Sequence, residues 1–311
     1  MGRDLQALGA PVVALDAAAA MLGLARVEAP DAWCVQADLE RLPIRDGALQ
    51  GAWARASYLH IPRARLPWAL MELHQALAVR SPLELVVRRG SNEGALPDDS
   101  FPGRFFSEWE PEPLGDVVAG AGFDLRDCTV DAAAQEWVTA RATRARTLPD
   151  FVGPGMRILV CGLNPSEYAA DRGTGFARPG NRFWPAALAS GLVTRDRDPR
   201  HALSAHGVGM TDLVKRASAR AEGLGADEYR AGAARLERLV RWLEPAVVCF
   251  AGLTGYRAAV DRAAGAGPVP GGFAGAAAYV MPNPSGVNTH TSLDDLTAHL
   301  RAVVELADHA A

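Results

Sequence analysis

The sequence predicts an α/β protein of two domains, each with a mainly parallel sheet flanked by helices. Short apolar runs that end in glycine or an acid alternate with segments of helical periodicity, which is typical of buried parallel strands joined by helices. A chain of 311 residues suits two domains, and 49% hydrophobic with 22% charged residues is an ordinary globular composition. The same alternation occurs on both sides of a stretch rich in arginine, proline and glycine.

The first domain is placed at residues 1–140, where strand and helix patterns follow one another in β-α-β order. That order predicts a parallel sheet. We expect strands at 10–16 and 81–90, and helices at 17–27 and 66–78.

The second domain is placed at residues 141–311 and begins in a junction, residues 138–156. Clustered arginines (Arg141, Arg144 and Arg146) and helix-breaking prolines and glycines lead us to interpret that junction as a solvated basic linker, a phosphate contact being the alternative. The elements expected after it are a strand at 158–162, a helix at 184–192, an irregular strand and turn within 201–218, a helix at 229–243, strands at 246–252 and 279–281, and a final helix capped by Ser292.

The first of two distinctive loops follows the apolar strand that ends at Gly162. It continues through Leu163 and Asn164 and stays small and polar until a lone aromatic residue, Phe176, and Arg178. In open α/β sheets, ligands bind at the carboxyl ends of the strands, where this loop begins. An amide and an aromatic ring on one loop suit a flat polar ligand, although an ordinary strand-to-helix turn capped by Asn164 would read the same way.

The second loop follows the strand at 279–281 and is made rigid by two prolines and a glycine. It runs from Asn283 through Ser285 and Gly286 to Asn288, with the apolar Val287 at its tip. A proline-rich turn that caps the sheet is the structural alternative.

Together the two loops resemble the motifs of the mismatch-specific uracil/thymine-DNA glycosylases, a branch of the uracil-DNA glycosylase superfamily. That family has a GINPG-like first motif and an NPSGL-like second motif, which stand here as GLNPS and NPSGV in the same order and at about the same spacing. The intervening GTGFARPGNRFW is also similar. The resemblance extends from about Arg141 to the C-terminus and implies a three-layer α/β/α fold.

The resemblance implies a role for each residue of the first loop. Asn164 orients the attacking water, Phe176 stacks on the extruded base, and backbone groups of Gly162, Leu163 and Phe176 read the uracil edge. Arg178 is a candidate phosphate contact. Because an amide is a poor base, the resemblance implies a slow enzyme.

The second loop would be the DNA side of the site. Relatives with stronger uracil activity carry histidine where Asn283 stands, so this chain lacks a donor that stabilises the leaving base. Gly286, Val287 and Asn288 match the wedge that fills the gap left by the flipped nucleotide and contacts the widowed guanine. Ser285 is a further candidate phosphate contact.

The first domain resembles class I methyltransferases that use S-adenosylmethionine. Asp16 stands where that family holds the ribose hydroxyls, and Asp38 stands near the adenine. The family's first strand and glycine-rich turn should come earlier, where this sequence has only Met1-Gly2-Arg3. We therefore interpret this half as a truncated, inactive methyltransferase. A misplaced start codon is the alternative.

The distribution of charge and the spacing of the cysteines indicate which ligands and cofactors the protein could bind. Residues 1–140 carry 12 basic and 20 acidic side chains, whereas residues 141–311 carry 20 and 16, so the half with the glycosylase motifs is the one that suits DNA. Four widely spaced cysteines predict buried thiols instead of disulfides, a zinc site or an iron–sulfur cluster. No apolar run is long enough for a membrane span, and the N-terminal residues do not match a secretory signal, so we expect a cytoplasmic protein. We also expect it to be a monomer.

The sequence thus predicts a monofunctional DNA-repair glycosylase that flips uracil or thymine from G·U or G·T mismatches and leaves an abasic site. The glycosylase itself would need neither a metal nor a cofactor. Lys215, the one lysine, lies outside both motifs, which argues against a Schiff-base lyase. The alternatives are a methyltransferase with a nucleic-acid-binding second domain and a DNA-lesion binder without catalysis.

Overall fold

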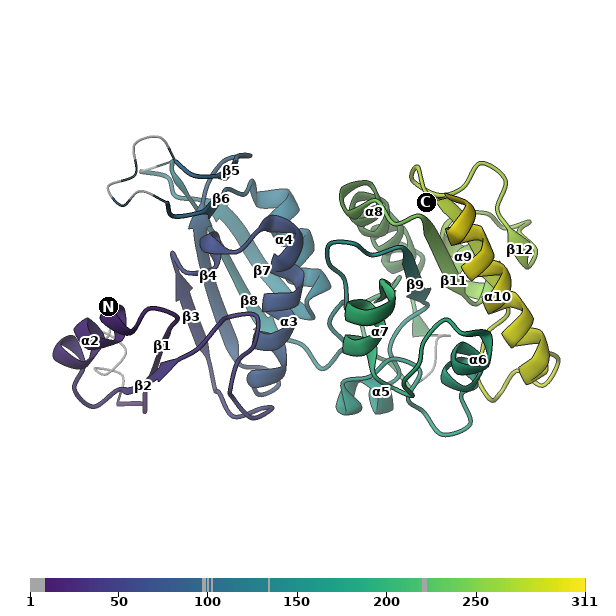
Figure 1. Ribbon diagram of the computed structural model, residues 1–311, viewed down its shortest axis with the longest axis horizontal. Helices are drawn as coiled ribbons and strands as arrows, with labels where there is room; N and C mark the ends of the chain where they lie inside the picture. The colour runs from purple at the N-terminus through teal and green to yellow at the C-terminus, as the bar shows by residue number, and fades with distance from the viewer. Residues whose placement is uncertain are drawn as a thin grey trace.

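A computed structural model describes residues 9–96, 99, 101, 103–133, 135–219 and 223–310. The chain forms two halves that lie side by side, each with its own sheet (Figure 1). The predicted α/β class, with helices packed on sheets, is confirmed.

The N-terminal half contains a four-stranded sheet in the order β3-β4-β8-β7, and β1 pairs with β2 in a separate two-stranded sheet. Its elements are β1 (Val13–Asp16), α2 (Ala19–Glu28), β2 (Trp33–Gln36), β3 (Ala52–Arg55), the 3₁₀ turns η1 (Tyr58–His60) and η2 (Arg63–Arg65), α3 (Leu66–Ala76), β4 (Pro82–Arg88), β5 (Glu93–Gly94), β6 (Phe106–Ser107), α4 (Pro111–Gly120), β7 (Phe123–Val130) and β8 (Trp137–Arg144).

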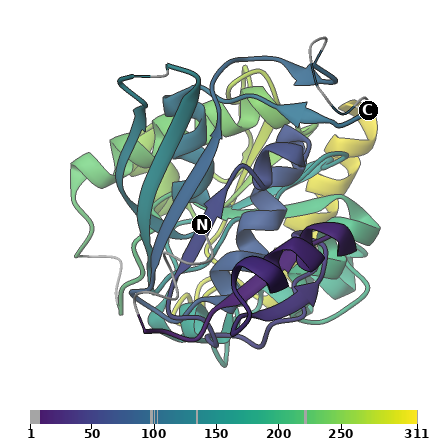
Figure 2. The same ribbon diagram turned by 90° about the vertical axis from the view of Figure 1, so that its left-hand side faces the viewer.

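The expected parallel sheet is only partly formed in this half. β1 with β2 and β3 with β4 are parallel, whereas β8 lies antiparallel to both β4 and β7. Helices α3 and α4 cover the face that is turned toward the C-terminal half (Figure 1). No described helix lies in front of the opposite face in Figure 2. On the strands of this sheet Arg141 donates to Glu84 (2.9 Å) and Asp127 (3.1 Å).

The linker interpretation of residues 138–156 is wrong, because the first part of that segment is a strand. β8 runs to Arg144, and the boundary placed between residues 140 and 141 therefore falls inside it. The arginines are not simply solvated: Arg144 is half-buried and donates to the carbonyl of His74, and Arg146 binds Asp171. Alternating small apolar residues in VTARAT gave β8 a buried face, which the clustered arginines obscured in the sequence.

The C-terminal half is built on a five-stranded sheet in the order β10-β9-β11-β13-β12, parallel except for the short edge strand β12. Its elements are β9 (Ile158–Gly162), α5 (Glu167–Arg172), α6 (Phe183–Ser190), α7 (Pro199–His206), β10 (Val208–Asp212), α8 (Ala226–Leu243), β11 (Val247–Ala251), α9 (Leu253–Ala259), β12 (Gly267–Pro268), β13 (Ala277–Met281) and α10 (Leu293–Ala310).

Helices cover both faces of this sheet, which explains the unbroken apolar runs of its strands. Ile158 and Val160 belong to the core shared with α6, α7 and α10, while the alternate residues Leu159 and Cys161 belong to the core shared with α8 and α9. The three-layer α/β/α arrangement is thereby formed. The region 201–218, expected to be irregular, contains the end of a regular helix and the parallel strand β10. A proline at N1 and the aspartate cap Asp198 begin that helix, two signals that the prediction overlooked.

The two halves share a packed interface. Met71 of α3 is fully buried and belongs to the core of the C-terminal sheet. Across the same interface Asp116 of α4 accepts from Arg238 of α8 (2.9 Å), and Trp109 packs edge-to-face on Trp242 with ring centroids 5.9 Å apart. The halves are therefore joined by apolar and charged contacts and not only by the chain.

Candidate functional site

The two loops predicted from the sequence meet at the carboxyl ends of the C-terminal strands. A Cβ atom on Gly286 would lie 2.7 Å from the carbonyl oxygen of Gly180, so the second loop packs directly on the first. The backbone N–H of Arg182 donates to the carbonyl of Pro284 (2.9 Å). Two segments about a hundred residues apart thus form one surface.

Arg182 holds this arrangement together, and sequence reasoning missed it. Its guanidinium donates to the carbonyls of Ser285 (3.1 Å), Asn288 (2.6 Å) and Thr291. These bonds run from the start of α6 to three points of the second loop. An arginine next to a predicted helix start was the available signal, but nothing in the sequence showed which carbonyls it would reach.

Asn164 follows β9 and is fixed by its amide nitrogen. Nδ2 donates to the carbonyls of Pro165 (3.2 Å) and Arg216 (3.1 Å) and to the hydroxyl of Ser218 (2.8 Å). Because backbone carbonyls only accept, the orientation of the amide is determined by chemistry. Among the described residues, none donates a hydrogen bond to its Oδ1.

Phe176 presents a flat aromatic surface beside this amide-bearing strand end. Its backbone has φ = 57°, a conformation that L-residues other than glycine rarely adopt. One ring face stacks on Phe183 at 4.3 Å, and Trp184 Nε1 donates to the carbonyl of Gly175 (2.8 Å), which anchors the loop. The ring is only partly buried at the edge of the core that it joins.

Asp212, at the end of β10, completes the site and was not singled out from the sequence. It lies in parallel register with Gly162 of β9. A Cβ atom on Gly162 would overlap Oδ1 of Asp212 and come within 3.5 Å of Cζ of Phe176, so carboxylate and ring meet over a glycine. The available signal was an acid at the end of a strand pattern, VGMTD, that we interpreted as irregular.

The environment of Asp212 favours its neutral form. Burial raises the pKa of this carboxyl to about 6, against the opposing attraction of Lys215 and Arg235, while the neighbouring Asp150 raises it further. Such a carboxyl changes charge close to neutral pH, which is a common property of proton-transferring groups.

A buried ionic cluster supports the end of β10 from behind. Asp150 accepts from Arg235 (2.7 Å), Lys215 (2.8 Å) and Thr211 (2.6 Å). Burial alone would raise the pKa of Asp150, but these partners hold it below its ordinary value. Arg235 also donates to the backbone carbonyl of Asp212 (2.9 Å), so the cluster fixes the strand end. Lys215 is engaged as a structural cation through its ion pair with Asp150.

Gly162 and Leu163 position the strand end with their carbonyls. These accept from the N–H groups of Leu213 and Val214, each at 2.9 Å. The Leu163 side chain packs against α9, where a Cβ atom on Gly255 would lie 2.6 Å from its Cδ1. Each of these carbonyls thus already accepts one backbone hydrogen bond.

The second loop presents Val287 at its tip, with 84% of its surface exposed. Asn283 Oδ1 accepts from the N–H of Ser285 (2.9 Å), and Asn288 Nδ2 donates to the carbonyl of Asn283 (2.9 Å). These bonds use both amides to shape the loop around the exposed valine. Arg178 is exposed on the first loop.

The acids predicted for S-adenosylmethionine end neighbouring strands of the N-terminal half. Asp16 ends β1 and accepts from the N–H of Ala18 (2.8 Å), and Asp38 lies just beyond β2. Among the described residues, no strand pairs with β1 on the side away from β2, and no glycine-rich strand-to-helix turn lies beside Asp16. The residues present therefore fit the cofactor incompletely, and no chemistry is derived from it. The predicted first segment, Met1-Gly2-Arg3, lies outside the described residues.

Two further expectations concern metals and membranes. Within the described ranges, no group of three His, Cys, Asp or Glu side chains is arranged to hold a metal ion. None of the helices in those ranges has the length and hydropathy needed to cross a bilayer. The four cysteines are free thiols; Cys161 and Cys249 are buried as predicted, whereas Cys34 and Cys128 are only partly buried.

Comparison with known proteins gives a family match for each half. The model of the uracil DNA glycosylase superfamily matches residues 149–307, and a methyltransferase domain model matches residues 2–81.

Among the solved structures similar to the chain are several methyltransferases. A SAM-dependent methyltransferase from Methanosarcina mazei is 13% identical, with a TM-score of 0.41. The matched region covers 47% of this chain and 87% of the methyltransferase. One from Mesorhizobium loti is also 13% identical (43% and 80%, TM-score 0.37). The 1,6-didemethyltoxoflavin-N1-methyltransferase from Burkholderia thailandensis is 17% identical (46% and 76%, TM-score 0.35). Similarities this weak carry no argument about activity.

Proposed function

Because the chain belongs to the uracil DNA glycosylase superfamily, whose members act on DNA, we propose that it excises uracil or a related base from G·U and G·T mismatches in duplex DNA. The observation that carries the proposal is the meeting of the Phe176 ring and the Asp212 carboxyl over Gly162. An aromatic plane for a base and a proton acceptor for water are the two things that this hydrolysis requires beside each other.

The extruded base stacks on the ring of Phe176. A water molecule donates one hydrogen bond to Oδ1 of Asn164 and transfers its other proton to ionised Asp212 as its oxygen attacks C1′ of the sugar. The bond between C1′ and the base nitrogen breaks, and its electron pair leaves with the base. The product is an abasic site, formed without a covalent enzyme intermediate.

Asp212 adds a proton acceptor to the water-orienting role expected of Asn164. An amide accepts a hydrogen bond but not a proton, so Asn164 orients the water and Asp212 removes its proton. With Lys215 held by Asp150, a Schiff base has no free amine nearby among the described residues, which supports a monofunctional enzyme.

Preference for mismatches follows from the second loop. Inserting an apolar side chain such as Val287 into the stack offsets part of the few kcal/mol lost on unstacking. Valine is a short wedge, and Asn283 offers the leaving base no cation. Bases that flip at low cost, as in G·U and G·T, are therefore favoured.

The test is a single-turnover assay on duplexes with G·U, G·T and A·U and on single-stranded uracil DNA, with alkaline strand cleavage as the readout. We expect excision from G·U to exceed that from A·U, and Asn164→Ala to remove it. Binding of G·U duplex without excision by the wild-type protein would favour a lesion binder instead.

A further inference from the structure

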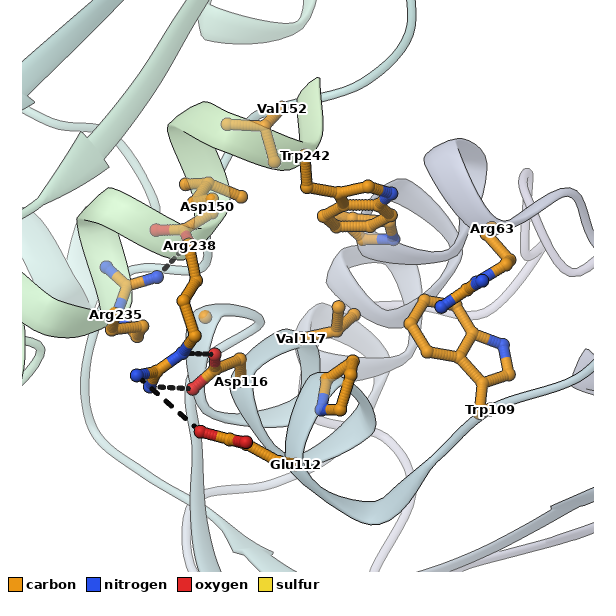
Figure 3. A pocket seen from close by; sticks show the side chains of 14 residues that line it. Arg63, Trp109, Glu112, Asp116, Val117, Asp150, Val152, Arg235, Arg238 and Trp242 are labelled. Atoms are coloured by element: carbon orange, nitrogen blue, oxygen red, sulfur yellow. Dashed lines mark hydrogen bonds and ion pairs between the residues drawn. The ribbon is translucent and has the colours of Figure 1, made fainter. Parts of the chain in front are cut away.

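A cavity of about 230 Å³ lies between the two halves, away from the two loops (Figure 3). Residues of α4 and α8 form two of its walls, and Pro67, Trp109 and Trp242 line it with aromatic and proline rings. Trp109 is 1% exposed, so this aromatic wall is part of the folded interior. Flat apolar walls of this kind suit a planar ring.

Hydrogen-bond donors in this cavity lack acceptors. Among the described residues, five buried side-chain polar atoms have no partner, and three belong to residues lining the cavity: Arg63 Nε, Trp109 Nε1 and Arg235 Nε. Arg235 is 8% exposed. Buried polar atoms without partners are rare in folded proteins, and their presence in residues around one cavity sets this part of the interface apart.

Arg63 brings charge and ring together. Its guanidinium carbon lies 4.7 Å from the centre of the Trp109 ring, and Figure 3 shows this pair next to Trp242, which Trp109 contacts edge-to-face. The acids of the lining are each paired with a cation: Asp116 and, at the longer distance of 3.7 Å, Glu112 bind Arg238, and Asp150 binds Arg235 and Lys215. Arg63 Nη1 donates to the carbonyl of Ser91 (3.3 Å), and among the described residues this guanidinium has no carboxylate partner, so an incoming anion meets a cation without an ionic partner there.

We propose that this interface cavity binds a small aromatic monocarboxylate. The ring lies against Trp109 and Trp242, and the carboxylate accepts from Arg63. The three cations and three acids of the lining balance one another, which leaves room for one added negative charge but disfavours a polyanion such as a nucleotide. A single one- or two-ring molecule matches the cavity volume.

The test is calorimetric titration of the full chain with 2-naphthoate and with its neutral isostere 2-naphthamide. We expect one site per chain, with naphthoate bound about tenfold or more tightly than the amide, because a charge-assisted bond to guanidinium is lost in the amide. No heat of binding at millimolar naphthoate, or equal affinity for both probes, would overturn the proposal without any variant.

Two variants locate the site. Arg63→Met removes the preference for naphthoate, while Arg65→Met, in the same 3₁₀ turn but paired with Glu40 outside the cavity, keeps it. Val117→Phe fills the cavity and abolishes binding of both probes. Loss of binding in Arg65→Met equal to that in Arg63→Met, or retention in Val117→Phe, would place the ligand elsewhere and overturn the assignment.

Discussion

Asp212 shows how one partly buried side chain couples stability to chemistry. Its carboxyl is taken out of water at the end of β10 and pressed against Gly162, and burial raises its pKa to about 6. Keeping such a group ionised at neutral pH costs free energy that a surface aspartate would not cost. Activity and stability should therefore respond to this residue in opposite directions.

The pH dependence of excision tests the role of Asp212 in the reaction. The rate should rise with pH and level off above about pH 6, because only the ionised carboxyl accepts a proton. Asp212→Asn should lower the single-turnover rate on G·U by about 100-fold or more and flatten the profile. A variant with an unchanged profile would assign the proton transfer to another group.

The same substitution should stabilise the fold. The folded-state pKa of Asp212 lies above its unfolded value of 3.8, so the favourable contribution of the neutral form is present at low pH and is lost as pH rises through about 6. At pH 7.5, Asp212→Asn should raise the free energy of unfolding by about 1–2 kcal/mol, and at pH 4 by much less. Urea unfolding at the two pH values measures the difference, and a loss of stability at pH 7.5 would contradict it.

His74, in the N-terminal half, should make the free energy of unfolding fall as pH is lowered, which is opposite to the effect of Asp212. Burial, followed by the nearby charge of Arg144, lowers its pKa to about 3, so the folded chain holds a neutral ring while the unfolded chain protonates near 6.5. Stability is then present above about pH 6.5 and is lost as pH falls toward 3. We expect a loss of about 2 kcal/mol by pH 5, absent in His74→Gln, as measured by urea unfolding across that range.

At the scale of elements, the position of the second loop depends on one side chain from the first. Arg182 supplies bonds to three backbone carbonyls of the loop that carries Val287. A rigid loop can insert its tip into a duplex without first being ordered, which saves entropy on binding. The strands place the reacting groups, and this arginine places the wedge.

Arg182→Met should therefore weaken duplex recognition more than chemistry. We expect single-turnover excision from G·U duplex to fall by about 10- to 100-fold, with a smaller loss on single-stranded uracil DNA, which needs no wedge. Arg178→Met, four residues away and exposed, is the matched control for loss of one positive charge. Equal losses of activity in the two variants would show that the loss comes from the missing positive charge and not from the missing bonds to the second loop.

Helices and strands could be predicted from the sequence where local hydrophobic periodicity and capping residues determine them. The strands at β9 and β11, the helix α8 and the capping box at Ser292 and Asp295 all follow from periodicity and capping rules, and the structure contains them. β8 was missed because it pairs with β4 and β7 through long-range contacts, and its arginine-rich local sequence gives no signal for that pairing. Asp212 was missed because its proximity to Gly162 depends on the strand order β10-β9, which adjacency in sequence does not show.

For the whole molecule, the interface decides how independent the two halves are. Met71 of the first half is buried in the core of the second, and Asp150, at the start of the second, donates its N–H to the carbonyl of Gly120 in the first (2.8 Å). Interfaces that share a core in this way resist separate domain motion.

The chain should accordingly unfold as one cooperative unit. Met71→Ala should lower the free energy of unfolding by about 2–4 kcal/mol, because it leaves a cavity in the second core, and should shift the transition of both halves together. Far-ultraviolet dichroism and tryptophan fluorescence in a urea titration would report the transitions. Two separated transitions in the wild-type chain would show that the halves are independent.

The placement of β8 has a consequence for how the protein is made. β7 is synthesised before β8, yet its partner in the sheet is β8, which lies between β7 and β4. During synthesis on the ribosome, β7 therefore stays unpaired until residue 144 has emerged. The second half of the chain emerges directly afterwards. An exposed strand edge invites wrong pairing with other nascent chains. Synonymous codons that slow translation of residues 123–144 should therefore lower the yield of soluble protein more than slow codons elsewhere in the first half.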